Sequence, residues 1–336
     1  MIFRVVWAVL IAALTLAAGP VLAGQRLDSI RQKGFLTCGV GADVPGFSQH
    51  RPDGQWIGFD VDICRAIGAA IFGAPDKVVF RPIDTLQTFL REPDIDLVLR
   101  GLTWTSGRET QGGLRFGPIT LYDGQGFLVP KKLNIKSPED LSGRPICVST
   151  DAAFLGGLRT YFREHKLTLK AVVKDRRADS ETALFAGRCD AMTADASELA
   201  EALIGRADRP QDYVILPQQI SKEPLAPLLR KGDDELFDAI RWAIFALIDA
   251  EELGITAANL ASMQSREDPD GKAFFAAAVT RDHELATGWA AAAVRAGGNY
   301  GEIFARNLGS ASKARLERGL SNSWLHGGLM YAPPIR

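Results

Sequence analysis

The sequence predicts a bilobal α/β protein with a cleft between its lobes. Two series of short apolar strands alternate with amphipathic helices, one between residues 35 and 99 and the other between 137 and 216. An extended, glycine-containing segment, residues 121–130, separates them and would carry the chain from one lobe to the other. A chain of 336 residues has room for two domains of ordinary size.

The first series has the order strand, helix, strand, helix, strand. Strands are expected at 35–40, 78–80 and 95–99, and helices at 60–72, capped by Asp60, and around 86–90. This order predicts a parallel sheet with right-handed crossovers.

The second series repeats the pattern. Strands are expected at 146–148, 171–173, 190–192 and 213–216, and helices from 137 after a Pro-led start, around 154–162, from 179 and up to about 204. A long amphipathic helix is expected at about 233–250, and the remainder, 255–336, is helical in pattern. Two lobes joined by extended crossovers leave a cleft, and such clefts bind small molecules by hinge closure.

Composition excludes several classes of function. The formal net charge is −1 and neither sign forms a long run, so no basic surface for nucleic acid is indicated. With four histidines and no HxH, HExxH or CxxC motif, neither a metal site nor a cofactor is expected.

Residues 1–23 predict a cleavable export signal. Arg4 supplies the positive start, residues 5–18 are almost entirely apolar, and Val21-Leu22-Ala23 is a small-residue cleavage site. The apolar run is shorter than the roughly 20 residues that a membrane span needs, which favours cleavage over anchoring.

Four cysteines fit the oxidising compartment that export implies: Cys38, Cys64, Cys147 and Cys189. An even count suggests two disulfides, with three possible connectivities. The pairs Cys38–Cys64 and Cys147–Cys189 would keep each bridge inside one lobe, whereas a bridge between lobes would restrict their movement. Four buried free thiols are the alternative.

Several motifs occur in a specific order along the chain. They are WIGFDVD at 56–62, IDLV at 95–98, LTWTSGRE at 102–109, YDGQGF at 122–127, GRCD at 187–190, TAD at 193–195, ISKEPL at 220–225, GNYGEIF at 298–304 and YAPP at 331–334. Together they resemble the periplasmic substrate-binding proteins of polar amino-acid ABC transporters, and the later motifs resemble the general L-amino-acid-binding subgroup.

The resemblance implies a type II periplasmic binding fold. Lobe 1 would be discontinuous, comprising residues 24–122 and 223–336 with a helical C-terminal extension, and lobe 2 would comprise 123–222. It also implies a monomeric periplasmic receptor, not an enzyme, that binds an amino acid or related zwitterion and delivers it to the membrane subunits of an ABC permease.

The resemblance also assigns the main binding residues. A buried zwitterion needs a partner for each charge, and the planar fork of arginine suits a carboxylate. Arg108 would clamp the α-carboxylate, with Thr103 adding hydrogen bonds. Asp195, in the loop before a helix, would take the α-ammonium from the opposite lobe. The ligand would then favour the closed state.

Phe47 is a further candidate, expected to pack on the ligand side chain. The nearby Trp56 and Trp104 are interpreted as packing residues instead.

Two departures from the family pattern leave the ligand open. Gly101-Leu102 stands where the subgroup has Asn-Thr, and residues 149–154 read STDAAF where the family has a Gly-Thr-Thr loop. Thr150 and Asp151 are the ligand-binding candidates of this loop. Asp151 would bind a basic side chain or second ammonium, or would simply cap the following helix.

Two other functions remain open from the sequence. One is a periplasmic enzyme on the same fold, similar to cyclohexadienyl dehydratases, in which Asp151 facing Arg108 would supply the acid. The other is a ligand sensor for a membrane signalling protein.

Overall fold

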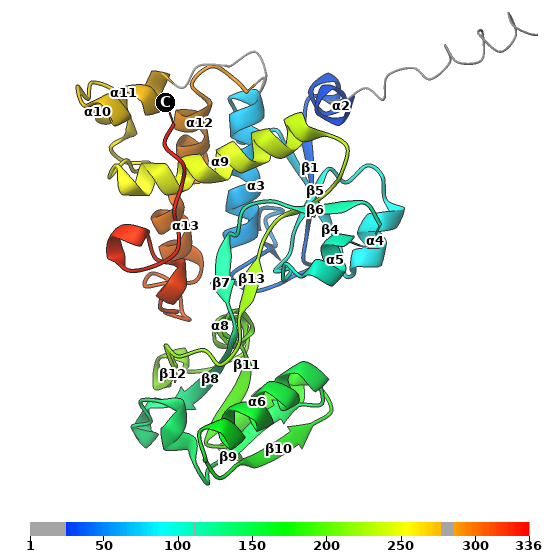
Figure 1. Cartoon of the computed structure of the whole chain (residues 1–336), viewed down its shortest axis with the longest axis vertical. Helices are drawn as coiled ribbons and strands as arrows, with labels where there is room; N and C mark the ends of the chain where they lie inside the picture. Colours follow the sequence, from blue (N-terminus) through cyan, green and yellow to red (C-terminus); the bar gives the residue numbers. More distant parts are fainter. Residues whose placement is uncertain (1–24, 111, 277–284, 336) are drawn as a thin grey trace, which may run out of the picture.

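The computed structural model describes residues 25–110, 112–276 and 285–335, and it forms two lobes joined by a narrow waist (Figure 1). The predicted bilobal α/β architecture is therefore confirmed. The predicted export signal lies outside the described residues. None of the helices in these three stretches is long and apolar enough to cross a membrane.

Lobe 1 is built on a five-stranded sheet. Its strand order is β4 (Val78–Pro82), β1 (Leu36–Val40), β5 (Leu97–Leu99), β14 (Leu228–Arg230), β6 (Leu114–Phe116). Strand β1 is parallel to β4 and β5, whereas β14 is antiparallel to β5 and β6.

Lobe 2 repeats this arrangement. Its strand order is β10 (Lys170–Lys174), β9 (Pro145–Ser149), β11 (Ala191–Asp195), β8 (Gln125–Pro130), β12 (Tyr213–Ile215). Strand β8 is antiparallel to β11 and β12. The parallel arrangement predicted for the first strand series is confirmed for β4, β1 and β5. Each complete sheet is mixed, because β14 in lobe 1 and β8 in lobe 2 run antiparallel to their neighbours. In each sheet the antiparallel strand is the one that the chain enters directly from the waist.

The waist is a two-stranded antiparallel ribbon. It consists of β7 (Leu121–Asp123) and β13 (Glu223–Leu225), which lead into β8 and β14 respectively. Their register places Tyr122 opposite Pro224 and Asp123 opposite Glu223. Both chain crossings therefore run side by side (Figure 1).

Helices cover both sheets. In lobe 1 they are α2 (Gln25–Lys33), α3 (Phe59–Phe72), α4 (Leu86–Arg91), α5 (Ser106–Thr110), α9 (Asp234–Glu252), α10 (Leu260–Met263), α11 (Pro269–Ala276), α12 (Trp289–Gly297) and α13 (Tyr300–Asn307). In lobe 2 they are α6 (Ala152–Glu164), α7 (Arg177–Phe185) and α8 (Ala196–Gly205). Shorter elements include the hairpin strands β2 (Gln49–His50) and β3 (Trp56–Ile57), and the 3₁₀ turns η2 (Lys131–Leu133), η3 (Pro138–Leu141) and η4 (Pro210–Asp212). The main core of lobe 1 lies among β1, α3, α9 and α12, where alanines and branched aliphatic side chains interdigitate.

The helical pattern expected for residues 255–336 is confirmed by α10 to α13, but the described residues after α13 contain no α-helix. Residues 308–335 contain the 3₁₀ turns η5 (Gly319–Ser321) and η6 (Trp324–His326). This segment braces the waist. The Tyr122 amide donates to Ser321 Oγ (2.8 Å), and Ala314 and Leu316 pack on the core of lobe 2.

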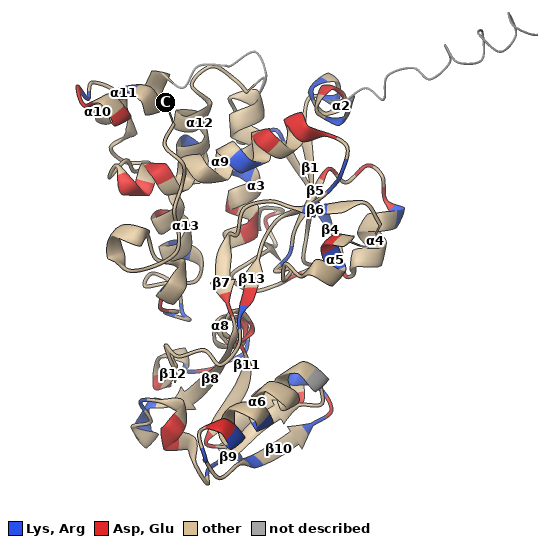
Figure 2. Ribbon diagram, viewed as in Figure 1, with Lys and Arg blue, Asp and Glu red and all other residues tan. Residues whose placement is uncertain are grey.

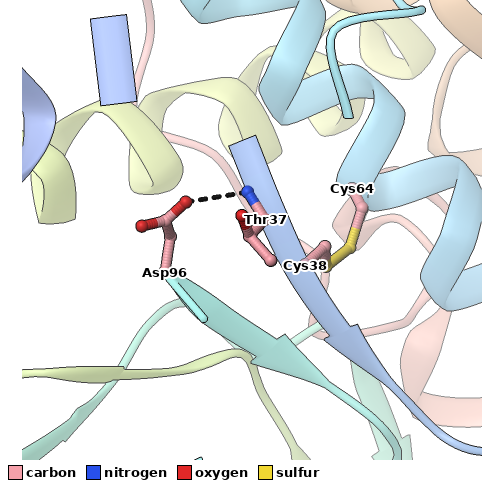
Figure 3. The surroundings of a disulfide bond; sticks show 4 residues. All are labelled: Thr37, Cys38, Cys64 and Asp96. Carbon is pink, nitrogen blue, oxygen red and sulfur yellow. Dashed lines mark hydrogen bonds between the residues drawn. A yellow bond between two sulfur atoms is a disulfide. The ribbon is translucent and has the colours of Figure 1, made fainter. Parts of the chain in front are cut away.

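Two disulfides each lie within one lobe, as in the lobe-internal pairing considered from the sequence. Cys38–Cys64 joins β1 to α3, and Cys147–Cys189 joins β9 to the segment before β11. Beside the first bridge, the Thr37 amide donates to Asp96 Oδ2 (2.7 Å), which links β1 to the start of β5 (Figure 3). Neither bridge crosses the waist, so neither restricts lobe movement.

Gly124 separates β7 from β8 and lies against Ser221 of the second crossing. A Cβ at this position would lie 2.3 Å from the Ser221 carbonyl oxygen, whereas a Cβ at Gly126 would meet Ala196 and Leu199 at 3.8 Å, an ordinary contact. We therefore expect Gly124→Ala to lower the free energy of unfolding by about 1–3 kcal/mol. Gly126→Ala, the matched control, should change it by less than about 1 kcal/mol. Equal effects of the two variants in urea unfolding would contradict this reading of the waist.

Candidate functional site

The site lies where the parallel strands of each sheet end. In lobe 1, β1, β4 and β5 run in the same direction, so the residues after them share one edge. In lobe 2, β9, β10 and β11 do the same. Ligands of open α/β sheets bind at this carboxyl edge, because loops and helix N-termini converge there.

Arg108 lies on α5, shortly after β5, and its guanidinium is held locally. Its Nη1 donates to the Thr103 carbonyl oxygen (2.7 Å), and its backbone amide donates to Thr105 Oγ1 (3.2 Å). The side chain is half-buried and forms no ion pair with any described residue. The guanidinium is therefore positioned, and its charge has no carboxylate partner from the described chain.

Thr103 connects the segment that carries Arg108 to the waist. We refer to this segment, residues 100–108, as the Arg108 wall. Thr103 is half-buried and forms a β-bridge with Leu225 of β13, while the Trp104 amide donates to the Pro224 carbonyl oxygen (2.7 Å). The Arg108 wall is thus attached directly to one of the two crossing strands.

Asp195 is the last residue of β11 and the N-cap residue of α8, so the strand reaches further than the sequence suggested. Its side chain accepts no capping hydrogen bond. The first amides of α8 are satisfied elsewhere: the Ser197 amide donates to Asp123 Oδ1 (3.2 Å) and the Ala196 amide to the Gly124 carbonyl (2.9 Å). Asp195 Oδ1 is consequently buried without a hydrogen-bond partner.

The surroundings of Asp195 are acidic. Burial is the main cause that raises the pKa of Asp195 to about 8, and nearby carboxylates raise it further: Asp123, Glu198, Glu223 and Asp151. Asp123 is itself buried, its Oδ2 has no partner, and burial raises its pKa to about 6. Figure 2 shows acidic residues at the adjoining ends of β7 and β13, next to α8. We refer to Asp195, Asp123, Glu198, Glu223 and Asp151 as the acidic cluster.

The polar side chains of the loop after β9 form hydrogen bonds within lobe 2. The Thr150 hydroxyl donates to the Asp175 carbonyl oxygen (3.0 Å), and Asp151 caps α6 by accepting from the Ala153 amide (3.0 Å). Both residues are exposed. Of the two roles considered for Asp151, the structure shows the cap.

Phe47 lies in the core of lobe 1 and not on a ligand-facing surface. It is 3% exposed and packs edge-on against Phe59, with ring centroids 6.1 Å apart. The loop before it is closed by Ser48 Oγ, which donates to the Gly41 carbonyl (2.8 Å), and this turn directs Phe47 inward. Trp104 stacks on Phe116, as expected for a packing residue.

The structure brings Arg108 together with Thr103 on one lobe, and Asp195 together with Asp151 on the other. Among the described residues, no hydrogen bond or ion pair joins Arg108 to Asp195. Two charged residues of the site were not predicted from the sequence, Arg100 and Asp123. Arg100 directly follows β5, and that position at a strand's carboxyl end is the signal that would have found it.

No group of three or more His, Cys, Asp or Glu side chains in the described ranges has the geometry to hold a metal ion.

The raised pKa of Asp195 makes stability depend on pH. An ordinary Asp titrates near pH 4, so the folded chain binds this proton more tightly than the unfolded chain, and stability is lost as pH rises from about 4 to about 8. We expect Asp195→Asn to stabilise the ligand-free protein in urea unfolding at pH 8.5 and to have little effect at pH 4.5. Asp208→Asn, at an exposed position of lobe 2, is the control and should show no such trend. A pH-independent effect of Asp195→Asn would contradict the buried-carboxylate interpretation.

Comparison with known proteins identifies the family. Residues 36–257 match the family described as bacterial extracellular solute-binding proteins, family 3. The chain is 42% identical, over 97% of both chains, to the general L-amino acid-binding periplasmic protein AapJ of Rhizobium johnstonii. It is 39% identical, again over 97% of both chains, to the glutamate/glutamine/aspartate/asparagine-binding protein BztA of Rhodobacter capsulatus.

A solved structure shows the same fold. An ABC transporter periplasmic binding protein from Brucella ovis, with glutathione bound, is 41% identical and superposes with a TM-score of 0.79, covering 94% of this chain and all of the other. The type II periplasmic binding fold implied by the sequence is thus confirmed. The chain belongs to family 3 of the bacterial extracellular solute-binding proteins.

Proposed function

We propose that this protein is a periplasmic receptor that binds an amino acid or a related zwitterion between its lobes and delivers it to an ABC permease. The observation that carries the proposal is a guanidinium on one lobe and a buried carboxyl group on the other, neither of which is used within the described chain. Arg108 has no carboxylate partner among the described residues, and Asp195 has a buried oxygen without any partner. The names of the AapJ and BztA relatives support an amino-acid ligand.

The two ends of a zwitterion fit these two groups. The Arg108 guanidinium would donate two parallel hydrogen bonds to the α-carboxylate, with the hydroxyl of Thr103 beside it. The α-ammonium would donate to Asp195, whose Oδ1 has no hydrogen-bond partner among the described residues. Charge-assisted hydrogen bonds in a site shielded from water are the stronger kind, which is why both charges can leave solvent.

Ligand binding would close the lobes. We propose that residues 24–122 and 223–336 move as lobe 1, residues 123–222 as lobe 2, and β7 and β13 act as the hinge. A ligand held at both ends makes its full set of contacts only when the walls approach, so it shifts the equilibrium toward the closed state. The disulfides leave this motion free because each lies within one lobe.

The cellular setting follows from the same reasoning. We propose that residues 1–23 direct export and are removed, and that the receptor works as a monomer in the periplasm, where two disulfides are stable. We further propose that it catalyses no reaction. A dehydratase would need a positioned general acid, and Asp151, the acid considered for that role, is exposed and caps α6.

The clamp is tested by removing one charge at a time. We expect Arg108→Ala and Asp195→Asn each to weaken binding of the preferred amino acid by roughly 30-fold or more, since truncating one partner of a buried charge pair costs about 2–5 kcal/mol. Isothermal titration calorimetry after a thermal-shift screen of amino acids measures this directly. Arg91→Ala, which removes an exposed arginine at the end of α4, is the matched control and should bind normally. If no amino acid binds at millimolar concentration, or if both site variants bind normally, the proposal is wrong.

A further inference from the structure

We infer that Arg100 forms a second anion-binding position beside Arg108, and that the receptor therefore prefers amino acids with a carboxylate on the side chain. This inference rests on the proposed function, because it assumes that Arg108 and Asp195 hold the backbone end of an amino acid.

The position of Arg100 is fixed by the sheet of lobe 1. Val40 pairs with Leu99, the last residue of β5, so Arg100 emerges at the carboxyl edge where β1 and β5 end together. The charges that act on its guanidinium are, in decreasing order, those of Asp84, Asp60, Arg108 on the same wall, and Glu201 on α8 of lobe 2. A side chain influenced by both lobes lies at the face between them.

Arg100 also lacks an internal partner that would use up its charge. It is half-buried, it forms no ion pair with a described residue, and its Nε is buried without a hydrogen-bond partner. Glu201 is held by Arg177 at 2.9 Å. Asp84, the other nearby acid, is an exposed loop residue.

The remaining neighbour, Asp60, does not neutralise it fully. The Asp60 side chain is buried and its Oδ2 has no hydrogen-bond partner. Burial raises the pKa of Asp60 to about 7, so this carboxyl is only partly ionised near neutral pH. Arg100 and Arg108 therefore place two guanidinium groups, without ion-pair partners among the described residues, on the lobe 1 side of the site.

Two guanidinium groups on one wall match two carboxylates on one ligand. With the α-carboxylate on Arg108 and the α-ammonium on Asp195, a side-chain carboxylate is the group that Arg100 can hold through charge-assisted bonds. A side-chain amide of the same shape offers only a neutral oxygen and presents its NH₂ group to a donor. A second ammonium would be repelled by Arg100, although it would suit the acidic cluster.

Glutamate and glutamine test the inference because they are nearly isosteric. We expect calorimetry of the mature protein at pH 7 and low salt to show L-glutamate binding about tenfold or more tightly than L-glutamine. In Arg100→Gln the ratio of the two affinities should fall to near one, and Arg100→Lys, which keeps the charge, should retain part of the preference. Arg91→Gln is the matched surface control and should keep the wild-type ratio. Circular dichroism checks that each variant is folded.

Several results would overturn the inference while leaving the proposed function intact. They are equal affinity of the wild type for glutamate and glutamine, an unchanged ratio in Arg100→Gln, or tighter binding of L-lysine or L-ornithine than of glutamate. The last result would assign specificity to the acidic cluster instead. Binding of no amino acid at all would be a different result, because it removes the proposed function itself.

Discussion

A buried carboxylate without a partner is the constraint on which the site depends. Asp195 ends β11 and begins α8, a position where an aspartate ordinarily caps the helix. Asp123 and Gly124 from the waist take those helix amides instead, which leaves Asp195 Oδ1 buried, unpaired and surrounded by other acids. Such an arrangement is unfavourable in the empty protein, and it becomes favourable when a cation arrives.

The waist links this constraint to the rest of the molecule. Asp123 lies on β7, opposite Glu223 of β13, so both crossing strands contribute acids to the neighbourhood of Asp195. The Arg108 wall is attached to β13 through Thr103 and Trp104. The two walls of opposite charge therefore belong to separate sheets but share the same pair of connecting strands. A ligand that carries both charges acts on both walls and on the hinge between them.

The sequence predicted what depends on local pattern and missed what depends on distant contacts. Strands such as 146–148 and helices such as 60–72 follow from apolar periodicity. The antiparallel entry of β8 and β14 does not, because it depends on how two chain crossings pair at the waist. Phe47 was misassigned because its burial results from a loop turn closed by Ser48. Asp123 was missed because the groups that give it a role are far away in sequence. Arg100 was missed although its position directly after β5 is a local signal.

Proton release on ligand binding tests the central claim most directly. With a pKa of about 8, Asp195 is mostly protonated in the free protein at pH 7, and it must ionise to hold an ammonium group. Calorimetry in buffers of different ionisation enthalpy counts the protons released. The account predicts release approaching one proton per bound amino acid at pH 7, decreasing toward zero at pH 9 and abolished in Asp195→Asn. Tight binding without proton release at pH 7 would contradict it.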